Sequence, residues 1–155
     1  MLNRNNAHFE ELRRIGYEFE EKRRAHEEKK QQILEDYGWE SDELKAWYEE
    51  KKEMTYPVEA GACKAYRAWS QSVENEKDEV EMDDFLWDRE VKDFVEAMRE
   101  AGIESFIYTN SSTALMENMH RLTDEGCRMG KLVKISRQNL WREPEEVLGI
   151  RFFLH

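Results

Sequence analysis

Residues 102–113 have the sequence GIESFIYTNSST, and they mark the point where the chain changes from helices to a mixed fold. Gly102 suits the left-handed conformation that ends a helix. Residues 105–109 (SFIYT) are mostly aromatic or β-branched, which is typical of a short buried strand. The polar residues 110–113 are typical of a helix start. The stretch therefore predicts a helix, a strand and a second helix in succession.

The segment before Gly102 predicts a helix with one strongly apolar face. Asp84 is placed to cap this helix. The apolar residues recur with the helical period. They are Trp87, Val91, Phe94, Val95 and Met98.

The segment after residue 113 predicts a helix and two strands. Leu115, Met119 and Leu122 form one helical face, and Gly126 closes that helix. Residues 127–136 and 147–154 are predicted as strands that pair as an antiparallel hairpin. A strand-helix-strand unit favours a parallel, right-handed crossover. We therefore expect an α+β fold with a helix-strand-helix-strand-strand unit, a small three-stranded mixed sheet and helices on one face.

The N-terminal half predicts three helices. The first spans 5–36, where Leu12, Phe19, His26 and Ile33 recur every seven residues. Lys22 and Lys29 interrupt this seam, so we expect the helix to pack on the two helices that follow it. Ser41 caps the second helix, and Pro57 fits the first turn of the third.

These elements predict three regions along the chain. Residues 1–73 form a helical region, 74–84 an acidic linker or helix extension, and 85–155 an α+β domain. With 39% apolar and 38% charged residues, a chain of 155 residues can bury a core without disulfides or metals. The two cysteines have no CxxC partner, and neither a signal peptide nor a transmembrane stretch is evident. We expect a cytoplasmic protein.

The net charge of −11 is concentrated in one part of the chain. Residues 37–104 carry 20 acidic and 9 basic side chains, whereas the segments before and after them are nearly neutral. An acidic protein is repelled from nucleic acid and anionic membranes and attracted to basic protein surfaces. The partition therefore favours a protein partner with a basic surface, without direct nucleic-acid or membrane binding, and leaves a homodimer open.

The candidate partner-binding surface lies in this acidic part. Residues 74–100 contain twelve acids and four bases, and carboxylates at helical spacing can imitate a row of phosphates. The alternative is a solvated face that only keeps the protein in solution. The candidate residues are Glu74, Glu76, Asp78, Glu79, Glu81, Asp83, Asp84 and Asp88.

A second candidate is an anion site at the predicted helix start. Free N–H groups there can bind phosphate, and hydroxyl groups can assist. The residues are Asn110, Ser111, Ser112 and Thr113. No glycine-rich loop or lysine accompanies them, so this is not a P-loop, and plain helix capping is the favoured interpretation.

Two further alternatives involve residues of the C-terminal half. Ser111, Glu117 and His120 could serve a small hydrolase or nuclease, but the sharp GxSxG turn of a serine nucleophile is missing. We expect no catalytic residue, cofactor or metal site. A nucleic-acid-binding regulator is the other alternative, since basic residues and a tryptophan follow one another along a predicted strand and loop. They are Arg128, Lys131, Lys134, Arg137, Trp141 and Arg142.

Residues 87–126 and the closing LGIRFF motif resemble small acidic proteins of bacterial mobile elements. The shared features are a helix ending in AGI, an F-x-Y-T strand, an ALMEN helix start and a glycine before the next strand. That group includes anti-CRISPR-type inhibitors, so the resemblance implies a non-enzymatic inhibitor or adaptor that binds a CRISPR effector. The resemblance leaves residues 1–73 uncovered and brings no known active site.

Overall fold

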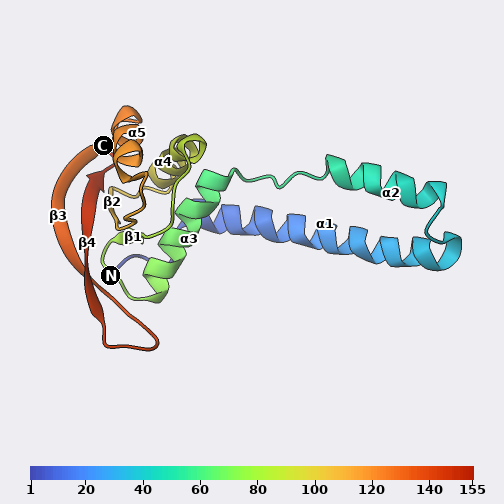
Figure 1. The fold of residues 1–155 in the computed structure, drawn as a ribbon, viewed down its shortest axis with the longest axis horizontal. Coiled ribbons are helices and arrows are strands. Elements are labelled where there is room, and N and C mark those ends of the chain that lie inside the picture. Colours follow the sequence, from blue (N-terminus) through green and yellow to red (C-terminus); the bar gives the residue numbers. More distant parts are fainter. The chain divides into compact units, whose positions relative to one another are not determined.

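The computed structural model describes all 155 residues, and the chain forms two compact units. The first unit combines Met1–Glu10 with Glu59–His155, and the second is Glu11–Val58. Figure 1 shows the elements: α1 (Ala7–Tyr37), α2 (Asp42–Glu53), α3 (Ala60–Glu74), β1 (Val80–Met82), the 3₁₀ helix η1 (Asp88–Glu90), α4 (Val91–Glu100), β2 (Ser105–Tyr108), α5 (Leu115–Asp124), β3 (Arg128–Arg137) and β4 (Glu145–Phe153). No helix is long and apolar enough to cross a membrane.

The first unit contains one mixed sheet with the strand order β1-β2-β4-β3. Strand β2 runs parallel to β1 and antiparallel to β4, which pairs antiparallel with β3. The predicted α+β class and the terminal hairpin are confirmed. The expected number of three strands is wrong, because β1 adds a fourth.

Strand β1 lies inside the segment predicted as an acidic linker or helix extension. Val80 and Met82 are buried on the side that carries Phe106 and Tyr108 of β2, while Glu81 points to the opposite face. Two apolar residues among acids are too short an alternating pattern to predict a strand. Burial against β2 and α3 creates it.

The parallel crossover also differs from the prediction. The parallel neighbours are β1 and β2, which are joined through η1 and α4. Strand β3 was expected beside β2, but β4 lies between them. The β3–β4 hairpin therefore pairs with β2 through its second strand, β4.

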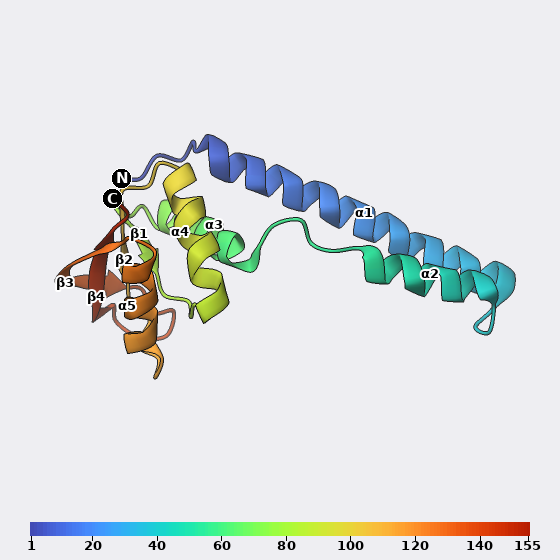
Figure 2. The ribbon, with the colours of Figure 1, turned by 90° about the horizontal axis from the view of Figure 1, so that it is seen from above.

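The core of the first unit lies between the sheet and its helices. Figures 1 and 2 show α3 and α4 on one side of the sheet, and α5 contacts both α4 and β3. Phe106 stacks on Phe152 at 5.6 Å between ring centroids, and Phe94 of α4 meets Phe106 edge-on at 5.3 Å. Asn118 of α5 donates a 3.0 Å hydrogen bond to the Tyr108 hydroxyl group, which fixes α5 to β2.

Helix α3 belongs to this core and not to a separate helical region. Its small residues Ala65 and Ala68 are buried, and a Cβ atom on Gly61 would lie 2.2 Å from the carbonyl oxygen of Glu90. This close approach lets α3 pack against η1 and α4. The compact units divide the chain after Glu10 and after Val58, whereas the sequence predicted regions of 1–73, 74–84 and 85–155.

The ends of the helices match the predictions only in part. Ser41 caps α2 by accepting a 3.2 Å hydrogen bond from the Leu44 N–H, and Gly102 ends α4 with φ +73°. Pro57 lies before the first turn of α3, which begins at Ala60. Asp84 does not cap α4, since η1 intervenes and Asp84 instead accepts from the N–H of Phe85.

The second unit is a helical hairpin made of α1 and α2. The His26 ring stacks on Trp47 at 4.5 Å, and the Trp47 indole donates a 2.6 Å hydrogen bond to the His26 carbonyl group. Phe19 meets Tyr56 edge-on at 5.1 Å. The predicted heptad stripe on α1 therefore packs within the chain, on α2 and the segment after it.

Candidate partner-binding surface

The eight predicted partner-binding carboxylates do not form a row at helical spacing. Glu74 ends α3, Glu81 lies in β1, and Asp88 begins η1, so the acids follow three kinds of local structure. The expected imitation of a row of phosphates required a continuous helix. That part of the prediction is wrong.

Six of these eight carboxylates form ion pairs within the chain. Two of the pairs engage both oxygens of the carboxylate: Arg121 donates to both carboxylate oxygens of Asp88, and Arg151 donates to both of Glu79. The Glu79 carboxylate raises the pKa of the Arg151 guanidinium through this hydrogen bond. The remaining pairs are Glu76 with Arg4, Asp78 with the N-terminal ammonium, Glu81 with Lys77 and Asp84 with Arg67.

Glu74 and Asp83 are the two members of the set without an ion pair, and they line the same hollow. Its volume is about 810 Å³, and Glu76 and Glu81 also line it. Both unpaired carboxylates are exposed to solvent. Of the eight candidate partner-binding residues, the structure thus leaves two carboxylates without an ion pair, and both line one hollow.

The opposite wall of this hollow comes from the end of the β3–β4 hairpin. Lys77 donates a 2.8 Å hydrogen bond to the carbonyl oxygen of Ser136 and forms a 3.1 Å ion pair with Glu81. Arg137 donates to the Thr109 hydroxyl group at 3.0 Å. These cations are engaged by neighbours, so they fix the wall without pairing with Glu74 or Asp83.

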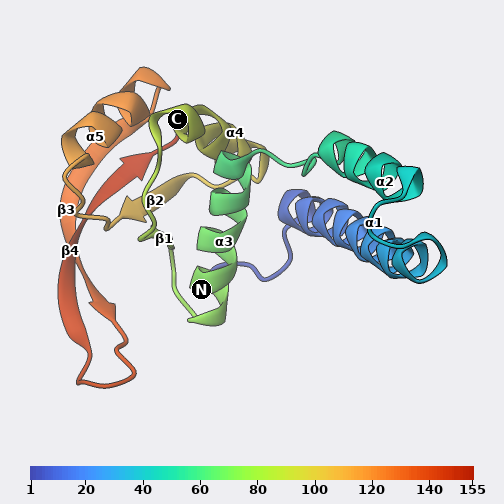
Figure 3. The ribbon, with the colours of Figure 1, turned by 45° about the vertical axis from the view of Figure 1, so that its right-hand side comes forward.

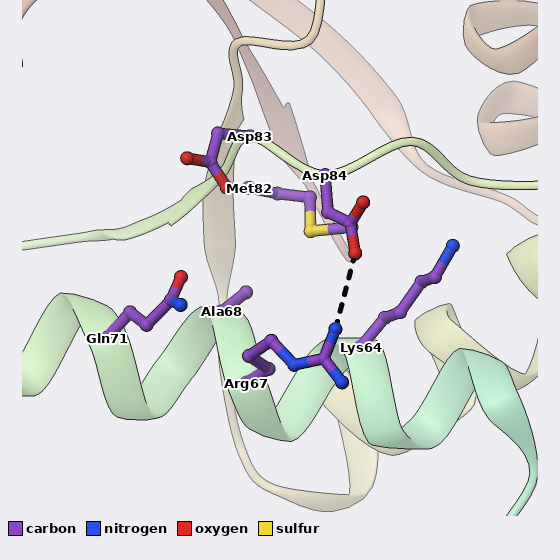
Figure 4. Close-up of a pocket in the computed structure, with 7 residues that line it drawn as sticks. All are labelled: Lys64, Arg67, Ala68, Gln71, Met82, Asp83 and Asp84. Carbon is purple, nitrogen blue, oxygen red and sulfur yellow. Dashed lines mark ion pairs between the residues drawn. The ribbon is translucent and has the colours of Figure 1, made fainter.

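A smaller hollow of about 310 Å³ lies next to it, between α3 and the residues after β1 (Figure 4). The Asp84 carboxylate points toward Arg67 of α3 at 3.6 Å, and the Asp83 side chain lies on the far side of Met82 (Figure 4). Asp83 therefore borders both hollows. It is the only one of the eight candidate residues that lines both.

One buried ion pair was not foreseen from the sequence. Lys64 lies 2.7 Å from Glu90, which is buried and also accepts a hydrogen bond from the Trp87 N–H. The pair joins α3 to η1 and is a structural element. The only indication of this ion pair in the sequence was a lysine on an otherwise apolar helical face.

The predicted anion site is not at a helix start. Helix α5 begins at Leu115 with Ala114 as its N-cap and no side-chain cap, so the capping interpretation of residues 110–113 is wrong. Asn110 instead folds the loop, accepting from the Ser112 N–H and donating to the Asp83 carbonyl group. The Ser112 hydroxyl group is buried without a hydrogen-bond partner.

The residues of the hydrolase alternative do not form a hydrogen-bonded set. Ser111 lies in the loop before α5, while Glu117 and His120 are exposed on that helix. His120 lies 3.4 Å from Asp124, one turn further along. No group of three or more potential ligands is arranged to hold a metal ion.

The five basic residues of β3 and the loop after it form no ion pair, whereas Arg151 of β4 pairs with Glu79. Arg128 lies over the Phe153 ring at 4.3 Å from its centroid, and Arg137 bonds Thr109 as described. Trp141 in the loop is 91% exposed. Figure 3 shows this loop farther from α4 and α5 than the rest of the sheet. The alternation of faces along β3 prevents these cations from forming a single stripe.

The first unit is thus a small α+β domain with helices packed on a four-stranded mixed sheet. At one end of that sheet lies the larger hollow, which Glu74 and Asp83 line and which is called here the acidic hollow. Residues 64–154 match the model of the family described as Domain of unknown function (DUF7698), and this chain belongs to that family. The match runs from α3 to the end of β4 and includes Glu74 and Asp83. No curated protein and no solved structure matches the chain.

Proposed function

We propose that this protein is a non-enzymatic inhibitor or adaptor that binds a protein partner with a basic surface. The observation that carries the proposal is the convergence of Glu74 and Asp83, both without an ion pair, on one hollow. A lysine or arginine side chain of the partner would enter this hollow and form charge-assisted hydrogen bonds with them. Thr109 and Ser136 on the wall offer further oxygen acceptors.

The remaining charge of the first unit supports approach of the partner. This unit carries 21 acidic and 14 basic side chains, and most of its ion pairs are exposed to solvent. Exposed pairs contribute little stability and leave the long-range field of the excess carboxylates intact. We therefore expect the negative field to accelerate encounter and the hollow to supply specificity.

The resemblance to mobile-element proteins supports one kind of partner. Proteins that handle nucleic acid carry large basic grooves, and a CRISPR effector is the candidate that this resemblance implies. A nucleic-acid-binding regulator is the second candidate function. The favouring observation is the exposed Trp141 beside unpaired cations, while the net charge of −11 opposes it.

The proposal is tested by affinity capture from a bacterial lysate, followed by measurement of the dissociation constant of each captured basic protein. The double variant Glu74→Lys, Asp83→Lys should bind at least about tenfold more weakly, because two charge-assisted hydrogen bonds are replaced by repulsion. The control Glu104→Lys, Glu117→Lys changes the net charge equally at exposed, unpaired carboxylates outside the hollow. It should bind like the wild type.

Equal weakening in both variants would show that only net charge matters. Unchanged binding of the hollow variant would show that Glu74 and Asp83 are not the contact site.

A further inference from the structure

Two segments of this chain carry opposite charge, and the charged side chains within each segment all have the same sign. Residues 35–43 (EDYGWESDE) contain five carboxylates and no cation. Residues 128–142 (RMGKLVKISRQNLWR) contain five cations and no carboxylate. The first segment joins α1 to α2, and the second comprises β3 and the loop after it.

The segment 35–43, called here the acidic turn, exposes large aromatic side chains among its carboxylates. Tyr37 is 60% exposed and Trp39 is 74% exposed. Asp42 forms the only ion pair of the turn, at 3.7 Å from Lys45. Solvent-exposed tryptophan and tyrosine beside unpaired charge are typical of residues that anchor protein interfaces.

The β3–β4 hairpin has the complementary composition. Leu132 is 66% exposed and Leu148 is 60% exposed, and the strand register places Lys134 opposite Leu148 on the face that they share. Strand β3 is the edge of the sheet. Glu145 and Glu146 of β4 lie opposite Arg137 and Ser136, and neither forms an ion pair. None of the five cations forms an ion pair. Arg128 lies over the Phe153 ring and Arg137 bonds Thr109, which leaves Lys131, Lys134 and Arg142 available to an outside carboxylate.

We propose that the acidic turn of one copy of this chain docks on the β3–β4 hairpin of a second copy. Carboxylates of the turn would pair with Lys134 beside the exposed leucines, with Arg142 in the loop and, around the free edge of β3, with Lys131 on the other face. Trp39 would cover the exposed leucines. The occupant is a second copy, and not RNA, because opposite charge and apolar surface are matched within one sequence while the net charge of −11 repels a polyanion.

The geometry of such a contact determines the kind of assembly. A pair of copies joined by one such contact has one free turn and one free hairpin left. If these two also meet, the pair closes as a two-fold dimer, and otherwise copies add head to tail into a ring or a chain. At about 0.15 M salt the Debye length is about 8 Å, so paired charges in contact still attract while the overall repulsion is screened.

Sedimentation velocity of the full chain over a range of concentrations tests the proposal. We expect concentration-dependent association at 0.15 M salt that weakens at least tenfold at 0.5 M salt. The acidic-turn variant has three substitutions: Glu35→Lys, Glu40→Lys and Glu43→Lys. The hairpin variant has three others: Lys131→Glu, Lys134→Glu and Arg142→Glu. Each should raise the dissociation constant at least tenfold, and their equimolar mixture should restore association because the charges are exchanged.

Controls keep the result interpretable. The variant with Glu28→Lys, Glu104→Lys and Glu117→Lys has the charge of the acidic-turn variant and should associate like the wild type. The melting curves should stay unchanged, since all these residues are exposed. The substituted residues do not line the acidic hollow, so partner capture tests a separate claim.

Three results would overturn the proposal. They are a wild type that stays monomeric at every concentration, a mixture of the two variants that does not associate, and single-stranded RNA binding by a monomeric wild type that the hairpin variant loses.

Discussion

Burial changes the acid–base chemistry of one side chain, the thiol of Cys127. The thiol lies between α5 and β3 and is almost fully buried. Removal from water raises its pKa from 9.0 to about 11. The thiolate, which is the reactive form, is therefore scarce at neutral pH, and we infer a packing role for this cysteine.

The first prediction is that Cys127 makes the protein less stable at alkaline pH. Above pH 9 the unfolded chain loses the thiol proton, whereas the folded protein keeps it until about pH 11. The unfolded state then binds fewer protons, so the free energy of unfolding falls as the pH rises through this window. Two pKa units correspond to about 2.7 kcal/mol as an upper limit. Urea unfolding at pH 8 and pH 11 should show a smaller alkaline loss for Cys127→Ala than for the wild type.

Equal alkaline losses in the two proteins would contradict this explanation. Other groups that titrate above pH 9, such as the buried Tyr108, are present in both proteins and cancel in the comparison.

Individual residues also show where sequence reasoning ends. The cap at Ser41 and the stop at Gly102 could be predicted, because both depend on neighbours within four residues. The ion pairs formed by carboxylates of the predicted acidic surface could not be predicted. Asp88 meets Arg121 across 33 residues, and Glu79 meets Arg151 across 72. Which carboxylates remain free depends on the fold.

At the scale of elements, α1 shows how a periodic pattern can emphasise the wrong residue. The heptad stripe singled out Phe19, which is only half-buried. Phe9, which the pattern only added to the N-terminal end of the stripe, is fully buried. Its ring stacks on Trp69 at 5.1 Å and meets Tyr66 edge-on at 6.1 Å. The beginning of α1 thus contributes to the core of the first unit.

The second prediction compares these two phenylalanines. Phe9→Ala should lower the free energy of unfolding by about 3–4 kcal/mol, because it leaves a cavity among aromatic rings. Phe19→Ala should cost about 1–2 kcal/mol, since much of the side chain is already in water. Urea unfolding followed by tryptophan fluorescence measures both losses. A larger loss for Phe19→Ala would mean that the heptad stripe is the true core of α1.

The strands differ in how well the sequence predicted them. Strands β2, β3 and β4 have long apolar or alternating runs, and all three were expected within a few residues of their observed bounds. Strand β1 is three residues long and stabilised by contacts made only after folding. Ser72 of α3, for example, accepts a hydrogen bond from the Glu81 N–H at 2.9 Å.

At the scale of the whole molecule, the α+β class could be predicted, but the division into units could not. The apolar face of α3 indicated a buried helix without showing which neighbour covers it. In the structure it packs on α4 and β1 and belongs to the first unit, which combines Met1–Glu10 with Glu59–His155. The family match begins at residue 64, inside α3, and so covers most of this first unit.

At this scale the carboxylates fall into two groups, those paired within the chain and those free to contact a partner. Six of the eight candidate carboxylates form ion pairs within the chain, and the two that do not, Glu74 and Asp83, line the acidic hollow. The central claim is that this hollow receives a cationic side chain of a partner under electrostatic steering.

The most direct measurement is the association rate constant with the captured partner as a function of ionic strength. We predict that the wild-type rate falls at least about tenfold between 0.05 and 0.5 M salt, because steering is screened. The Glu74→Lys, Asp83→Lys variant should associate more slowly at low salt, with a flatter salt dependence, and should dissociate faster. Identical rates and identical salt dependence for the two proteins would contradict the claim.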